Sequence, residues 1–214
     1  MSSARAARKA AAFPLGQMIA AALAVLVCAA APARAQIDTH ATPTIAMTER
    51  TSESHYEVTG LTPQHLARSF QRQPNPGVMA QTDGGLSLRF DFAFGDQGCQ
   101  LMGAELALHI HTTYPLWRER DRGPEAMRRE WDRFAGALRV HEDIHGDLFR
   151  SEAQRLAERL ESLPPARSCD GLHRAIDRER DAFDRAITQA QAAYERDTRN
   201  GAAQGARLRF SATD

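Results

Sequence analysis

Apolar and polar residues alternate in two neighbouring segments of the first half of the chain. Residues 86–94 place Leu or Phe at every second position, and residues 102–110 repeat the alternation with Met, Leu and Ile. A period of two is typical of a strand with one buried face. A turn at residues 95–98 joins the segments, which predicts adjacent antiparallel strands, the second ended by Pro115. A short strand at residues 55–59 and a helix over 63–72 are expected before them.

The second half of the chain changes to a spacing of three and four. A first helix is predicted over residues 124–162, ended by two prolines, and a second over residues 171–198. Apolar stripes run along both helices: Met127, Trp131, Phe134 and Leu138, then Leu172, Ile176, Phe183, Ile187, Ala190 and Tyr194. The pattern predicts an α+β fold, a small antiparallel β-sheet followed by a long α-helical hairpin.

An H-E-x-x-H motif, His141-Glu142-Asp143-Ile144-His145, lies within the first long helix. Imidazoles four residues apart share one helical face and can bind one Zn²⁺. Glu142 is then placed to take a proton from zinc-bound water, as in a metallohydrolase. A buried histidine is more often a hydrogen-bonded core residue. Two histidines on the apolar stripe, with Glu142 between them, would need several polar partners to be buried without a metal. Zinc ligation is therefore favoured.

A catalytic zinc takes three protein ligands and one open position. Six residues after His145 stands Ser151, so the metzincin extension is absent. Glu152 lies two turns away, about 10 Å along the axis, too far for the same ion.

The second helix offers better candidates for the third ligand. If the hairpin turn centres near residue 167, position 143 faces position 191, give or take one turn. Tyr194, Glu195, Asp197 and Asn200 fall within that reach. Asp197 continues the inner stripe, so periodicity favours it slightly. Acidic residues on a charged helix are otherwise solvated.

His109 and His111 form a rival pair of ligands on one strand face. An H-x-H pair on a strand can chelate a metal, but exposed strand positions commonly carry polar residues, and solvent exposure is the favoured interpretation.

The N-terminus has the features of a secretory signal over residues 1–35. Three basic residues precede an apolar run at 18–31 that is too short for a confident membrane span, and Ala33-Arg34-Ala35 is a cleavage-site pattern. Residues 36–54 are polar and predict a flexible leader. The mature chain then holds a single domain over residues 55–210, in the periplasm or secreted.

The net charge and the cysteines of the mature chain indicate which partners and which cellular compartment to expect. Removing residues 1–35 leaves 23 basic and 27 acidic residues, a net charge of −4, so nucleic acid is not an expected partner. Cys99 and Cys169 are the cysteines of the mature chain, and an oxidising compartment predicts one disulfide between them.

Several motifs together resemble one family, the bacterial secreted proteins predicted to be zinc-dependent proteases (domain of unknown function 922). They are Tyr56-Glu57-Val58-Thr59-Gly60, Gly98-Cys99, Tyr114-Pro115-Leu116-Trp117, Trp131, Phe134, the H-E-x-x-H motif, residues 194–201 and Gln204-Gly205-Ala206. The resemblance implies a zincin-like domain that hydrolyses peptides.

The closing segment of this family usually reads Tyr-Asp-x-x-Thr-x-His-Gly. Here Glu195 stands in the Asp position and Asn200 in the His position. The alignment therefore favours Glu195 as third ligand. If the family's His is the ligand instead, Asn200 is a poor substitute.

The sequence thus predicts an exported zinc-dependent metallohydrolase, a peptidase with a peptide or protein substrate. His141, His145 and either Asp197 or Glu195 bind Zn²⁺, and Glu142 is the base. Tyr194 either donates a hydrogen bond to a developing oxyanion or fills the hairpin interface. The alternatives are a non-catalytic periplasmic or envelope binding protein with a vestigial site, and a structural metal that staples the hairpin.

Overall fold

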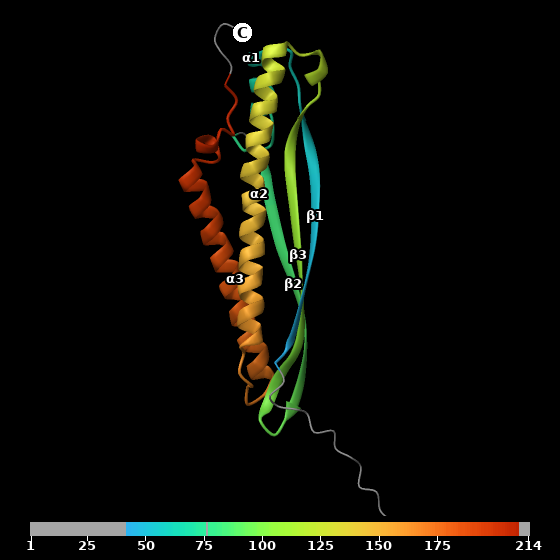
Figure 1. Ribbon diagram of the computed structural model, residues 1–214, viewed down its shortest axis with the longest axis vertical. Helices are drawn as coiled ribbons and strands as arrows, with labels where there is room; N and C mark the ends of the chain where they lie inside the picture. The colour runs from blue at the N-terminus through green and yellow to red at the C-terminus, as the bar shows by residue number, and fades with distance from the viewer. Residues whose placement is uncertain (1–41, 76, 210–214) are drawn as a thin grey trace, which may run out of the picture. The chain divides into compact units, whose positions relative to one another are not determined.

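The fold is α+β, as the sequence predicts: a three-stranded sheet precedes two long helices (Figure 1). The computed structural model describes residues 42–75 and 77–209. The predicted signal segment, residues 1–35, lies outside them. The elements are β1 Thr44–Val58, α1 Pro63–Gln71, β2 Gln81–Gly95, β3 Gly98–Trp117, α2 Glu125–Glu161 and α3 Cys169–Thr198, with short 3₁₀ turns η1 Arg120–Arg122 and η2 Ala202–Gln204.

The sheet is mixed, with strand order β1-β3-β2. The predicted antiparallel pairing holds for β2 and β3, which a two-residue turn connects between Gly95 and Gly98. β1 pairs with β3 in parallel. β3 is thus the central strand, and β1 and β2 form the edges.

The prediction of a flexible leader over residues 36–54 is wrong from Thr44 onward, because β1 begins there. Eleven further residues extend the expected strand at 55–59 backwards, with Thr44 opposite Gly103 of β3. Nearly all of their side chains are exposed. This edge strand is held by main-chain hydrogen bonds, and its side chains are mostly exposed and polar. Apolar and polar residues therefore do not alternate along it, and the sequence gives no strand pattern.

Pro115 does not end its strand, contrary to the sequence prediction. β3 continues to Trp117, pairing Pro115 with Tyr56 of β1. β2 pairs with β3 only as far as Thr113, so Pro115 lies where β3 has a single neighbouring strand. One missing donor is tolerated at such an edge position.

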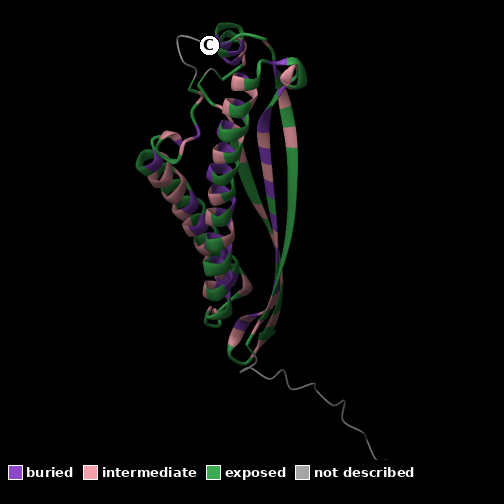
Figure 2. Ribbon diagram, turned by 45° about the horizontal axis from the view of Figure 1, so that its top comes forward, coloured by how far each residue is buried: buried purple, intermediate pink, exposed green. Residues whose placement is uncertain are grey.

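The helices cover one face of the sheet, and the buried residues gather between these two layers (Figure 2). One apolar cluster contains Trp117, Met127, Trp131 and Phe134, together with α1. A second contains Leu106, Leu108, Ile110 and residues of α3 and the C-terminal half of α2. Between the two clusters, α2 carries three buried polar side chains: His141, Glu142 and His145.

The predicted disulfide between Cys99 and Cys169 is present. It joins the start of β3 to the first residue of α3 across 70 positions of sequence. The main chain of Cys99 also exchanges two hydrogen bonds with Ala166, at 2.7 and 2.8 Å. Gly98, with φ +102°, is required here, because a Cβ atom would lie 2.2 Å from the carbonyl oxygen of Ala166. The turn of the helical hairpin is therefore anchored to the sheet.

None of the helices in the described part of the chain is long and apolar enough to cross a membrane.

Candidate metal centre

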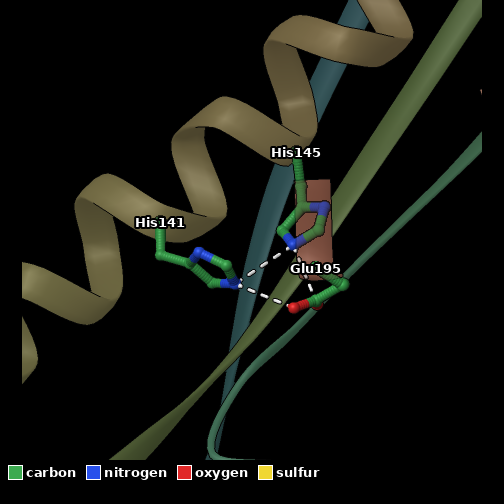
Figure 3. A group of neighbouring side chains, drawn as sticks. All are labelled: His141, His145 and Glu195. Atoms are coloured by element: carbon green, nitrogen blue, oxygen red, sulfur yellow. Dashed lines mark hydrogen bonds and ion pairs between the residues drawn. The ribbon is translucent and has the colours of Figure 1, made fainter. Parts of the chain in front are cut away.

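Three side chains from two helices converge at one point: His141, His145 and Glu195 (Figure 3). The histidines lie one turn apart on α2 and are 3% and 6% exposed. Glu195 comes from the last turn of α3 and keeps 39% of its side chain exposed. The group therefore has a buried side formed by the imidazoles and a partly accessible side formed by the Glu195 side chain.

The spacing of the potential ligand atoms fits a single ion. The Nε2 atoms of the histidines are 3.2 Å apart. Nε2 of His145 lies 3.1 Å from Oε1 of Glu195, and Nε2 of His141 lies 3.5 Å from Oε2. Ligands bound to zinc at about 2.0–2.1 Å with tetrahedral angles are about 3.3 Å apart. The two imidazole nitrogens and the carboxylate, whose candidate ligand atoms all lie within 4.8 Å of one another, are thus close enough to share one ion.

Two glutamines orient the imidazole rings. Nδ1 of His141 contacts Oε1 of Gln204 at 2.8 Å, and Nδ1 of His145 contacts Oε1 of Gln191. An amide oxygen only accepts, so each Nδ1 carries a proton, and in the neutral imidazole each Nε2 then presents a lone pair to the centre. Fixing the tautomer through the distal nitrogen is the usual arrangement around metal-binding histidines.

The centre lacks a positive partner among the described residues. Oε2 of Glu195 is buried and accepts no hydrogen bond within residues 42–75 and 77–209. Lone pairs of two imidazoles and a carboxylate facing each other repel unless a cation or a shared proton lies between them. The donor set and its spacing therefore fit a divalent metal ion, and nitrogen with carboxylate oxygen is a typical zinc set.

Tyr194 supports the centre from the side. Its ring stacks on His141, with centroids 4.9 Å apart and planes at 20°, and meets His145 edge-on at 4.8 Å. Its hydroxyl lies 3.1 Å from Oε1 of Gln204. Burial raises the pKa of this phenol above its usual value. The structure thus places Tyr194 in the hairpin interface as a contact of the rings, and a bond to an oxyanion stays a prediction.

Glu142 points toward the sheet beneath the metal group. It is 4% exposed, and its Oε2 accepts a hydrogen bond of 2.7 Å from the hydroxyl of Thr82 on β2. Burial raises the pKa of the Glu142 carboxyl, and the Thr82 bond offsets part of that rise. Thr112 on β3 contacts Thr82 at 3.1 Å and completes this polar layer.

A cleft of about 790 Å³ opens beside these groups. One wall is the beginning of β2 and the residues before it, and the other is α3 from Asp184 onward. Glu142, His145 and Glu195 all line it. The cleft therefore borders two of the three candidate metal ligands, His145 and Glu195, as well as the Glu142 carboxylate.

Asp197, which helical periodicity ranked slightly ahead of Glu195, is exposed and takes no part in the group. Two residues correspond to about 200° around a helix, so Asp197 points away when Glu195 points inward. Asn200 is also exposed and follows the helix end with φ 52°. Asparagine tolerates this left-handed conformation, and the main-chain N–H of Asn200 donates to the carbonyl of Glu195.

The other candidates from the sequence lie elsewhere. His109 is exposed on β3, and His111 is held between the hydroxyls of Ser52 and Ser54, each at 2.9 Å. Glu152 is buried and paired with Arg155. None of these residues belongs to the group of possible ligands found within the described chain.

Sequence reasoning missed Thr82 and Gln191. Gln191 stands four residues before Glu195, so the helical spacing that joins the histidines could have indicated it. Thr82 reaches Glu142 only through the placement of β2 under α2, for which the sequence carries no local signal.

Fold and site together define an α+β protein with a candidate His-His-Glu metal centre on a helical hairpin. The profile of a family described as "Bacterial protein of unknown function (DUF922)" matches residues 53–202, and the chain belongs to that family. Comparison with curated proteins and with solved structures finds no match.

Proposed function

We propose that this protein is a zinc-dependent metallohydrolase that cleaves peptide bonds. The observation that carries the proposal is the shared cleft, in which a buried carboxylate, Glu142, borders the same space as His145 and Glu195. A purely structural metal would not require a base and an open cleft at the ion. His141, His145 and Glu195 would hold the zinc, leaving a fourth position toward the cleft.

Zinc bound there would supply Lewis acidity, which lowers the pKa of a water molecule toward neutrality and polarises a carbonyl group. Glu142 accepts the proton of the attacking water and passes it to the leaving amine. Thr82 fixes the carboxylate for this role through its bond of 2.7 Å. Gln191 and Gln204 keep both imidazoles turned toward the ion.

We also propose that the protein acts outside the cytoplasm. A disulfide is expected in an oxidising compartment, and the sequence of residues 1–35 has the pattern of a cleaved signal. Mass spectrometry of the protein from a fractionated culture tests this proposal. A mature N-terminus at Gln36 in the periplasm or medium supports export, and an intact N-terminus in the cytoplasm contradicts it.

The activity is tested with Glu142→Gln and zinc-loaded wild type, using unfolded casein as substrate. The glutamine keeps the volume and can still accept the bond from Thr82, so zinc content and folding are expected to persist. Loss of the base should lower turnover by about 10²- to 10⁴-fold. Cleavage by the variant at the wild-type rate would reject the mechanism. Full zinc binding without cleavage by either protein would favour the binding-protein alternative.

A further inference from the structure

β2 is an edge strand, and its beginning lies beside the candidate metal centre. In the strand order β1-β3-β2, only one side of β2 is paired within the described sheet. Thr82 on this strand donates a hydrogen bond to Glu142, so the edge of the sheet is in direct contact with the candidate site. The outer edge of β2 therefore offers main-chain donors and acceptors next to the proposed base.

A cavity lies on each face of the sheet at this edge. The cleft of about 790 Å³ is on the helix side, where Thr82 points to Glu142. A second cavity of about 220 Å³ includes Gln81, Asp83 and Thr113 in its lining. Thr113 pairs with Gln81 in the register and bonds Ser54 on the uncovered face, so this cavity opens on the opposite side. Residues 78, 80, 81 and 83 border both cavities.

This arrangement matches the shape of an extended peptide. Successive side chains of a strand point to opposite faces, so a chain added to the β2 edge sends alternate side chains into the two cavities. Main-chain hydrogen bonds then provide affinity, and the two cavities select side chains.

The charges of the lining indicate which side chains fit. Neither lining contains Lys or Arg, and the acidic residues are Asp83, which borders both cavities, and Glu142, Asp184 and Glu195 in the larger cavity. Tyr56, Pro74 and Val78 give the smaller cavity apolar walls. A lysine or arginine side chain suits this combination, because its stem packs on apolar walls while its charged end reaches a carboxylate.

We infer that the substrate is an extended peptide that pairs with the β2 edge and places a basic side chain in the small cavity beside Asp83. The inference rests on the proposed function, since it names the substrate of that site. The inference concerns peptide binding, which precedes cleavage, so binding can be measured separately from hydrolysis.

Binding is measured on zinc-loaded Glu142→Gln protein, which does not consume its ligand. The probes are fluorescein-labelled heptapeptides of alanine with a central Lys, Gln or Glu, followed by fluorescence anisotropy. The Lys peptide is expected to bind most tightly and the Glu peptide least. Asp83 is exposed, so replacing it with Asn should remove a preference of about fivefold for Lys over Gln. Asp91→Asn, on the same strand but bordering neither cavity, is the matched control and should keep the preference.

Strand pairing is tested with the Lys peptide N-methylated at one main-chain nitrogen at a time. Methylation at alternate positions should weaken binding at least tenfold, and methylation between them less than twofold. No binding, no alternation, or an Asp83→Asn variant that keeps the preference would overturn the inference. Casein cleavage by wild type together with any of these results would leave the peptidase intact. The expected binding pattern without cleavage would uphold the peptide site and reject the peptidase.

Discussion

Replacing Glu195 with Gln, with Asp197→Asn as the control, tests which of the two acidic residues is the third metal ligand. The substitution keeps the size of the side chain and removes the charge that faces both imidazoles at 3.1 and 3.5 Å. Loss of a residue that only orients a ligand weakens metal binding by about 10- to 100-fold. Loss of one of three ligands should cost at least about 100-fold. Asp197 is exposed and should contribute nothing measurable.

The effect can be followed by melting temperature. Zinc at about 1,000 times its dissociation constant stabilises the folded state by about 4.1 kcal/mol. A 100-fold weaker site leaves about 1.4 kcal/mol at the same zinc concentration. For a chain of this length, each 1 kcal/mol corresponds to about 2–4 °C. The shift caused by zinc should therefore fall from about 8–16 °C to about 3–6 °C in Glu195→Gln.

The assay is a thermal melt of metal-free protein with and without zinc, supported by competition with a chelator. Without metal, Glu195→Gln should melt at or above the temperature of wild type, because an amide in place of an uncompensated carboxylate removes a repulsion at the centre. Asp197→Asn should keep the full zinc shift. The assignment is refuted if Asp197→Asn loses the shift, or if Glu195→Gln keeps it.

Three further outcomes are expected. Gln204→Ala removes the partner of the His141 Nδ1 atom and should weaken zinc binding by about 10- to 100-fold in the same titration, whereas unchanged affinity would exclude the orienting role. Thr82→Val removes the hydrogen bond to Glu142 and should lower kcat about tenfold with zinc content unchanged. Thr82→Ser keeps the hydroxyl and should restore kcat. A Thr82→Ser variant as slow as Thr82→Val would contradict the role of this hydrogen bond. Replacing Cys99 and Cys169 with Ser opens a loop of 70 positions and should cost about 4 kcal/mol in chemical denaturation, an expectation that an unchanged midpoint would contradict.

The helical half of the fold could be predicted closely because its pattern is strong. The expected helices over 124–162 and 171–198 correspond to Glu125–Glu161 and Cys169–Thr198. A long apolar stripe along a helix indicates which face of that helix is buried, and the stripe can be read from the helix sequence alone. The strand at Thr44 escaped prediction because its stability comes from pairing with β3, while its own side chains remain in water.

The two histidines of the candidate centre and the neighbouring Glu142 could be located from the H-E-x-x-H spacing alone. The third candidate ligand, Glu195, could not be located in this way, because its position depends on how α3 is rotated against α2. A periodic stripe fixes that rotation only to within about half a turn, and this is the difference between Glu195 and Asp197. Thr82 depends on the sheet register and could not be reached from any local pattern.

The central claim is that one divalent ion lies between two imidazoles and the Glu195 carboxylate. An anomalous difference map at the zinc absorption edge, from crystals of zinc-loaded protein, tests it most directly. The account predicts one strong peak about 2.0–2.2 Å from Nε2 of His141, Nε2 of His145 and an oxygen of Glu195. A fully loaded crystal with no peak there, or with the ion held by other residues, would contradict it.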